Sequence, residues 1–302
     1  MKKRLLATVA LAATAALGLS ACSSGGSGGG SGDGDKKDIT IAVFNGWAEG
    51  EATSYLWQAI LEDKGYNVKL EGADAGPVFT GLAQGDYDVT FDVWLPSTHA
   101  DYWKTYGDKL EDLGSWYQNA PLTIAVNEDA PIDSLADLAA NADKFGNKII
   151  GIEPGAGLTK ATAEKIIPQY GLDKMEFETS STAAMLAALK KATSQGQNIV
   201  VTLWKPHWAY DAFPIKDLKD PKDAFGEPDH IDTVGRAGFT EDFPEVAKWF
   251  GNWEFPDEKL AELEKLMFQP DESGNTPDAG EYPKIVKDWI AKNKDWVDSL
   301  TS

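Results

Sequence analysis

Short β-rich runs alternate with amphipathic helical stretches along most of the chain, and this alternation constrains the fold more than any other feature. Residues 39–44 are rich in β-branched and aromatic side chains, residues 51–64 carry apolar side chains at helical spacing, and residues 66–70 form the next β-rich run. Such alternation is typical of largely parallel sheets with helices on their faces. The predicted fold class is therefore α/β.

The alternation falls into two runs, and a mainly helical segment follows them. A chain of 302 residues is long enough for two domains of ordinary size. We expect lobe 1 to comprise residues 38–120 plus 233–302, because the helical segment can return to pack on the first run. Lobe 2 then comprises residues 121–232, and we expect a ligand cleft between the two lobes.

The N-terminus has the pattern of an export signal. Three cations at positions 2–4 precede an apolar run, residues 5–19, which is too short for a comfortable membrane span. The sequence Leu-Ser-Ala-Cys follows, and its Cys22 is the only cysteine of the chain. This tetrapeptide resembles the lipobox of bacterial lipoproteins, whose thiol is the lipid acceptor. The alternative is an ordinary signal peptide with an incidental cysteine.

We expect residues 1–21 to be a signal peptide and residues 22–37 to be a tether that begins at the lipidated Cys22. Positions 23–34 are almost wholly Gly and Ser, a composition that cannot bury a core and is typical of a linker. The predicted location is extracytoplasmic, on the outer face of the cell membrane, with the lipid as anchor.

Composition and missing motifs exclude several function classes. Asp and Glu number 48 against 28 Lys and Arg, and this balance argues against nucleic acid as a partner, since phosphates need clustered cations. The sequence has no HExxH motif and no paired cysteines, and it has no GxSxG elbow, since its match at residues 25–29 falls in the Gly/Ser run. We therefore expect no metal, no cofactor and no enzymatic activity.

Three of the tryptophans lie at the ends of predicted strands. Trp47 follows the first β-rich run, and Trp94 and Trp204 each end another. Ligands of open α/β sheets bind beyond the carboxyl ends of strands, so we expect these indoles to converge on the cleft. The alternative is that each ring only covers the edge of its own sheet. Tryptophans within the helical stretches are instead predicted to be core residues.

Three indoles suit one kind of ligand, a quaternary ammonium group. This group has no N–H to donate, and its charge is spread over methyl groups, so it is both apolar and cationic. Aromatic faces supply dispersion contacts and a negative π-surface together, at about 0.5–2 kcal/mol for each face. An enzyme acting on choline esters would use the same cation contacts, but it would need a nucleophile or metal that the sequence does not offer.

Two further features suit an anion. The glycine-rich residues 151–158 lead into a predicted helix, whose first backbone N–H groups are free to bind a carboxylate or phosphate. The alternative is a turn with no ligand. His99 follows Trp94 by five residues and can donate a hydrogen bond to an anion. A helix-capping or core histidine is the other interpretation.

These motifs together resemble the glycine betaine/proline betaine (and choline) substrate-binding lipoproteins of ABC importers, over about residues 38–300. Three segments carry the resemblance: Trp94-Leu95-Pro96-Ser97-Thr98-His99, Gly151-Ile152-Glu153-Pro154-Gly155-Ala156-Gly157 and Trp204-Lys205-Pro206-His207-Trp208. The resemblance implies a type II periplasmic-binding-protein fold, an ABC permease and ATPase as partners, and glycine betaine, proline betaine or choline as ligand.

The resemblance also implies a role for each site residue. The ammonium would lie among Trp47, Trp94 and Trp204. The carboxylate of a betaine would bind His99 and the backbone N–H groups of Gly157 and Leu158.

One departure concerns choline. Choline binders of this family carry an acidic residue near the first tryptophan, and Glu49 stands in such a place. It is equally a first-turn acid of a helix, favoured by the helix dipole. Tyr117 is a further aromatic that could reach the cleft. His99 and the glycine-rich turn favour betaine, so choline is the alternative ligand, and a sensory role is the alternative to transport.

Overall fold

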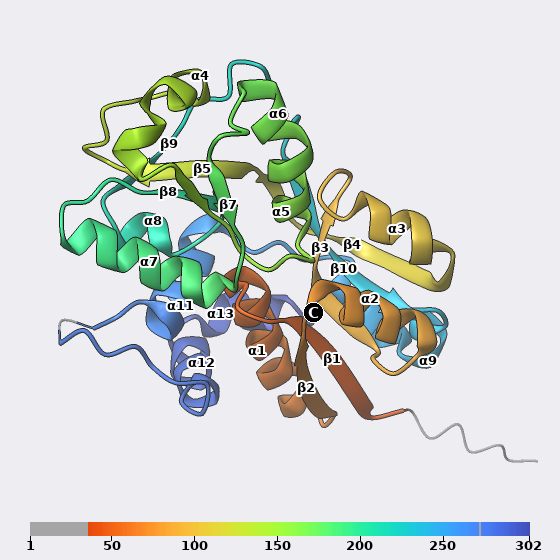
Figure 1. Cartoon of the computed structure of the whole chain (residues 1–302). Coiled ribbons are helices and arrows are strands. Elements are labelled where there is room, and N and C mark those ends of the chain that lie inside the picture. The colour runs from red at the N-terminus through yellow and green to blue at the C-terminus, as the bar shows by residue number, and fades with distance from the viewer. Residues whose placement is uncertain (1–35, 272) are drawn as a thin grey trace, which may run out of the picture. The chain divides into compact units, whose positions relative to one another are not determined.

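The computed structural model describes residues 36–271 and 273–302. The predicted signal peptide, Cys22 and most of the tether lie outside the described residues. Two five-stranded sheets with helices packed against them form the described part (Figure 1). No helix among the described residues is long and apolar enough to cross a membrane.

The first sheet has the strand order β2-β1-β3-β10-β4 and forms lobe 1. Strands β1, β2 and β3 are parallel, whereas β10 runs antiparallel to both β3 and β4. The elements of this lobe are β1 (Asp38–Phe44), α1 (Ala48–Asp63), β2 (Asn67–Ala73), α2 (Ala75–Gln84), β3 (Val89–Leu95), α3 (Ala100–Tyr106), η1 (Gly107–Lys109), β4 (Leu110–Ala120), β10 (Asp229–Arg236), α9 (Phe239–Asp242), α10 (Pro244–Phe250), α11 (Asp257–Phe268), α12 (Tyr282–Lys292) and α13 (Lys294–Ser299).

The second sheet has the strand order β7-β6-β8-β5-β9 and forms lobe 2. Strands β6, β7 and β8 are parallel, and β5 is antiparallel to β8 and β9. Its elements are β5 (Leu122–Asn127), α4 (Leu135–Leu138), η2 (Ala139–Phe145), β6 (Lys148–Ile150), α5 (Gly157–Ala161), η3 (Thr162–Ile166), α6 (Ile167–Tyr170), β7 (Glu176–Glu178), α7 (Thr182–Ser194), β8 (Val200–Trp204), α8 (Ala209–Ala212) and β9 (Ile215–Asp217).

The α/β class and the two lobes are confirmed, but the expectation of largely parallel sheets is wrong. Each sheet is mixed, because the chain passes between the lobes through the antiparallel strands β4, β5 and β10. Strand β4 (LEDLGSWYQNA) contains no β-branched residue, so its composition did not mark it as a strand. Strand β10 begins at Asp229, and the chain thus rejoins the first sheet shortly before the expected boundary at residues 232–233.

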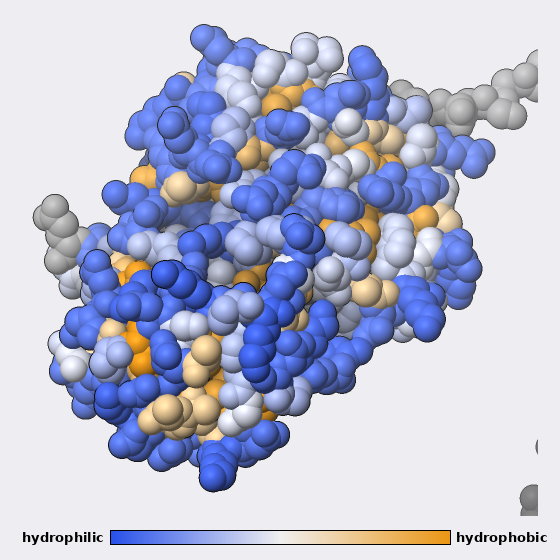
Figure 2. Space-filling model, turned by 90° about the horizontal axis from the view of Figure 1, so that it is seen from above, coloured by the Kyte–Doolittle hydropathy of each residue, from blue (hydrophilic) through white to orange (hydrophobic). Residues whose placement is uncertain are grey.

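The helical tryptophans pack in the core as predicted. Trp57 and Trp289 are fully buried, and Trp249 is almost so. Trp103 and Trp296 are partly buried and pack against the same hydrophobic cluster. On the face shown in Figure 2, hydrophilic residues predominate and hydrophobic ones form small separate patches, which fits the acidic composition.

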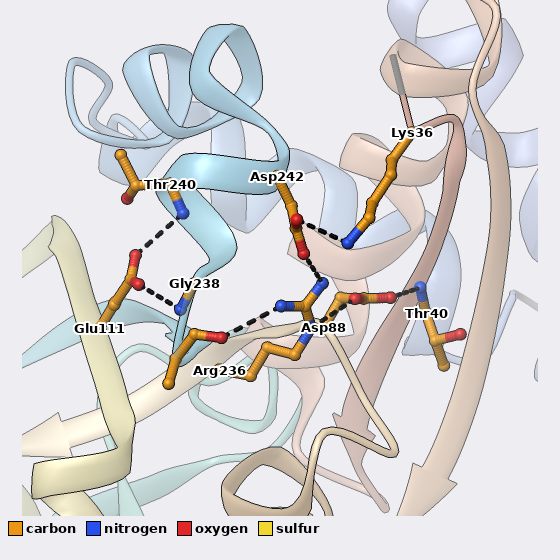
Figure 3. Close-up of polar contacts among 9 residues, drawn as sticks. Lys36, Thr40, Asp88, Glu111, Arg236, Gly238, Thr240 and Asp242 are labelled. Atoms are coloured by element: carbon orange, nitrogen blue, oxygen red, sulfur yellow. Dashed lines mark hydrogen bonds and ion pairs between the residues drawn. The ribbon is translucent and has the colours of Figure 1, made fainter. Parts of the chain in front are cut away.

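Arg236 joins three elements of lobe 1 (Figure 3). Its Nε donates to Asp88 Oδ1 at 2.8 Å and its Nη2 to Asp242 Oδ2 at 2.6 Å. Asp88 also accepts from the backbone N of Thr40 in β1, and Asp242 pairs with Lys36. Since charge-assisted bonds are stronger than neutral ones, this network fixes β1, the end of β10 and α9 to one another.

Candidate ligand-binding site

A small cavity of about 20 Å³ lies between residues of the two lobes. Lobe 1 contributes Trp47, Glu49, Trp94 and Thr98, and lobe 2 contributes Leu122, Ile152, Ala156, Leu158 and Trp204. The three tryptophans at strand ends therefore lie on one cavity. We call these three the aromatic box.

Strand geometry explains why the box forms. Strands β1 and β3 are parallel, so their carboxyl ends, where Trp47 and Trp94 stand, lie at the same edge of the first sheet. Trp204 ends β8 in the other sheet. The ring centroids of Trp47 and Trp204 are 6.3 Å apart and their planes are inclined at 57°. All three side chains are nearly buried, at 2–7% exposure.

Each indole N–H of the box has a different environment. Trp94 Nε1 donates to Asp92 Oδ1 at 2.7 Å, which fixes that ring from behind. Trp47 Nε1 donates across the lobes to Glu153 Oε2 at 3.5 Å. Trp204 Nε1 has no acceptor among the described residues, and its ring packs edge-on against His207.

Glu49 is fully buried on the wall of this cavity, and neither of its carboxyl oxygens has a hydrogen-bond partner among the described residues. Burial raises the pKa of Glu49 well above its ordinary value, and the nearby carboxyls of Asp92 and Glu264 raise it further. The indole N–H of Trp204 lies near enough to Glu49 to lower this pKa in part, although the two groups do not meet hydrogen-bond geometry. An unpaired carboxyl is thus part of the ligand cavity.

His99 lies behind Trp47 and is not among the side chains that line the cavity. Its ring stacks on Trp47, with centroids 5.6 Å apart and planes 7° from parallel, and it also packs on Phe44. Burial lowers the pKa of His99 to about 3, so the ring is neutral at pH 7. Because Nδ1 accepts from Trp94 N, the proton resides on Nε2, which has no partner in the described part of the chain.

The glycine-rich turn meets lobe 1 closely. Gly157 begins α5, and a Cβ there would lie 2.1 Å from the carbonyl O of Thr98, so only glycine fits. Thr98 in turn is held by Asp229, which accepts from the backbone N–H groups of Ser97 and Thr98. Leu158 lines the cavity, and its N–H is among those at a helix start that have no acceptor within the helix.

Comparison with known proteins identifies the family. Residues 37–292 match the family described as the substrate-binding domain of ABC-type glycine betaine transport systems. The chain belongs to this family. It is a family of binding domains and not of enzymes, and the two lobes have the type II periplasmic-binding-protein arrangement of its solved members.

Several members are similar in sequence and structure. The glycine betaine/carnitine transport binding protein GbuC of Listeria monocytogenes is 34% identical over 177 residues, which cover 57% of this chain and 55% of GbuC, little more than half of that relative. The glycine/betaine/L-proline-binding protein ProX of Borrelia burgdorferi superposes with a TM-score of 0.80 at 29% identity, covering 88% of this chain and 97% of ProX.

Two ligand-bound structures are also similar. Lactococcal OpuAC complexed with glycine betaine gives a TM-score of 0.79 at 27% identity, covering 88% of this chain and 100% of OpuAC. An ABC-transporter choline-binding protein in complex with choline gives a TM-score of 0.76 at 25% identity, covering 88% of this chain and 91% of the choline-binding protein. The fold alone is thus compatible with either solute.

The remaining residues of the site divide into those that line the cavity and those that do not. Tyr117 is not on the wall; it is half-buried, and burial together with Asp257 raises the pKa of its hydroxyl. Thr98, Ile152 and Ala156 line the cavity and lie within the segments that carry the family resemblance, but the sequence did not single them out. Leu122 had no sequence signal at all.

Contacts between the lobes surround the cavity. The Tyr102 hydroxyl donates to the carbonyl O of Gly155 at 3.0 Å, and Lys160 pairs with Asp101. Glu153, which accepts from Trp47, also accepts from the backbone N and the hydroxyl of Thr182 at 2.7 and 2.9 Å. Its position next to the box is therefore fixed from lobe 2.

Proposed function

We propose that this protein captures a quaternary ammonium solute outside the cytoplasm and delivers it to an ABC permease driven by an ATPase. The observation that carries the proposal is that Trp47, Trp94 and Trp204, from both lobes, line one cavity. Contacts on both lobes favour the closed arrangement when solute is bound, because the ligand then meets groups that the open form separates.

The energetics suit a methylated cation. Each indole face contributes about 0.5–2 kcal/mol, more when water is excluded, so three faces contribute a few kcal/mol before the loss of ligand freedom. The cavity wall offers apolar neighbours in Leu122, Ile152 and Leu158 for the methyl groups. A primary amine would leave its N–H groups poorly matched there.

Glycine betaine is the first candidate ligand. The family match and the solved relative with bound glycine betaine support it. Its carboxylate would be received by the N–H groups of Gly157 and Leu158, and by His99 through Nε2–H if the ring turns toward the solute. Proline betaine has the same two charged groups and the same expected contacts.

Choline is the second candidate, and Glu49 is the observation that favours it. An unpaired carboxyl on the cavity wall suits a ligand that carries a positive charge and a hydroxyl but no carboxylate. A relative of similar fold was solved with choline bound. If the site is specific for choline, Glu49→Gln weakens choline more than glycine betaine.

Calorimetric titration with glycine betaine, proline betaine, carnitine and choline tests the proposal. We expect saturable binding of at least one of them, accompanied by a change in tryptophan fluorescence. Absence of both heat and fluorescence change with all four would refute it. We expect His99→Ala to weaken the binding of betaine far more than that of choline. Equal losses for both solutes would mean that His99 does not receive the betaine carboxylate.

We further propose that Cys22 carries the lipid that anchors the protein to the outer face of the membrane. The apolar run and the Leu-Ser-Ala-Cys sequence support this. Growth with labelled palmitate should label the wild type and leave Cys22→Ser unlabelled and released from membranes. Equal labelling of both would refute the anchor.

A further inference from the structure

Three buried carboxyl groups, those of Glu49, Asp92 and Glu264, lie close enough for their charges to act on one another. Glu49 of α1, Asp92 of β3 and Glu264 of α11 are each at most 1% exposed. Both oxygens of Glu49, Oδ2 of Asp92 and Oε1 of Glu264 have no hydrogen-bond partner among the described residues. The Asp92 carboxyl rests directly on Gly50, where a Cβ would lie 2.3 Å from Oδ2. Gly50 follows Glu49 in the chain, so Asp92 lies against the backbone that carries Glu49.

The groups that face this cluster do not neutralise it. Glu51 of α1 acts on Asp92, Asp211 of α8 acts on Glu264, and Tyr117 of β4 faces both Glu49 and Glu264. None of these neighbours in the described part of the chain is a cation. The nearby imidazoles, His99 and His207, have pKa values lowered to about 3 by burial and stay neutral.

Three negative charges cannot persist together in a dry interior without a cation. Burial raises the pKa of Asp92 to about 7 and that of Glu264 to about 8, and it raises the pKa of Glu49 as well. The cluster therefore holds protons near neutral pH when the box is empty. Only Glu49 of the three is on the cavity wall, so a cation in the box acts on the cluster through Glu49.

We propose that binding of a quaternary ammonium in the aromatic box releases a proton from the cluster of Glu49, Asp92 and Glu264, so that solute affinity is linked to pH. The O–H bond of a carboxylic acid breaks, the proton passes to the buffer, and the carboxylate left behind faces the ligand cation. The ligand itself is unchanged. This inference rests on the proposed function. It adds that the carboxyl cluster of the same site carries one proton fewer when the solute is bound than when the site is empty.

The linkage has a measurable size. When one proton leaves for each ligand bound, affinity rises tenfold per pH unit, and the slope falls to zero once the cluster is already ionised. Calorimetry of the mature chain, purified in detergent, should be run with choline and with glycine betaine between pH 5.5 and 8.5. Repeating each titration in phosphate and in Tris, whose ionisation heats differ, gives the number of protons released.

Two variants and a control assign the proton to this cluster. Glu49→Gln should abolish proton release and flatten the pH dependence. Glu264→Gln removes one of the charges that hold protons on Glu49, so it should shift the pH profile to lower pH even if Glu49→Gln folds poorly. Glu258→Gln is the matched control, because Glu258 lies exposed on the same helix, α11, and should leave both readouts unchanged.

The outcomes separate this inference from the proposed function. Wild-type protein that binds choline or glycine betaine with the same affinity at every pH, and with no buffer-dependent heat, refutes the proton linkage and leaves the function intact. Linkage that persists in a folded Glu49→Gln variant, or a pH profile that Glu264→Gln leaves unshifted, also refutes it. Failure of the wild type to bind any quaternary ammonium overturns the proposed function and this inference together.

Discussion

Replacing Trp204 by leucine removes one aromatic face of the box while keeping an apolar side chain in its place. Trp204 is 3% exposed and its ring centroid lies 6.3 Å from that of Trp47, so a bound ammonium would be largely dry. A cation–π contact under such conditions is worth about 1–2 kcal/mol, so the dissociation constant should rise about 5- to 30-fold. Trp204→Phe keeps a smaller aromatic face, so it should lose less affinity than Trp204→Leu.

The assay is calorimetric titration with the best-binding quaternary ammonium, with thermal unfolding to confirm that each variant is folded. Trp208→Leu is the control, since Trp208 lies four residues away, is partly buried and does not line the cavity. It should bind within about twofold of the wild type. If Trp204→Leu also binds within twofold, or if Phe and Leu lose equally, the indole does not act through its π-face.

Three further predictions concern pH, steric fit and stability. Glu264 has a pKa of about 8 in the folded protein and an ordinary one in the unfolded chain, so the folded state binds more protons between about pH 4.5 and 8. The protein therefore loses stability as the pH rises through that window. Glu264→Gln should raise the melting temperature of the ligand-free protein more at pH 8 than at pH 5, and an equal change at both pH values would contradict this. Gly157→Ala would place a Cβ 2.1 Å from the Thr98 carbonyl and should weaken solute binding at least tenfold in calorimetry, whereas Gly155→Ala, whose Cβ meets only a tyrosine hydroxyl at 3.7 Å, should not. Arg236→Lys loses the paired bonds to two carboxylates and should lower the free energy of unfolding by about 1–3 kcal/mol in a urea titration, without a change in ligand affinity.

The box could be predicted because its geometry follows from a general property of sheets. Trp47 and Trp94 end parallel strands of one sheet, so their proximity follows once the strands are assigned. Trp204 ends a strand of the other sheet, and its position next to Trp47 needs only that the two sheets face each other. No detailed side-chain packing was required for these inferences.

The mixed character of the sheets could not be predicted from local pattern. Strand β4 has positive φ at Gly114 and at Asn119 and shifts register against β10 several times, so its side chains do not alternate cleanly between buried and exposed. Local sequence carries little information about a strand of this kind. Its pairing with β10, more than a hundred residues later, is a tertiary contact.

The carboxyl cluster also lay beyond sequence reasoning. Glu49, Asp92 and Glu264 come from a helix start, a strand and a distant helix, and no spacing relates them. In a chain with 48 acidic residues, composition gives no reason to select these three. Their burial alone distinguishes them. Glu49 was a candidate only through the resemblance to choline binders.

A crystal structure of the mature protein with bound glycine betaine or choline tests the central claim most directly. We predict that the quaternary nitrogen lies within about 6 Å of the ring centroids of Trp47, Trp94 and Trp204, with Glu49 on the same wall of the cavity. A solute bound elsewhere, or in the cavity with its ammonium turned away from all three indoles, would contradict the account.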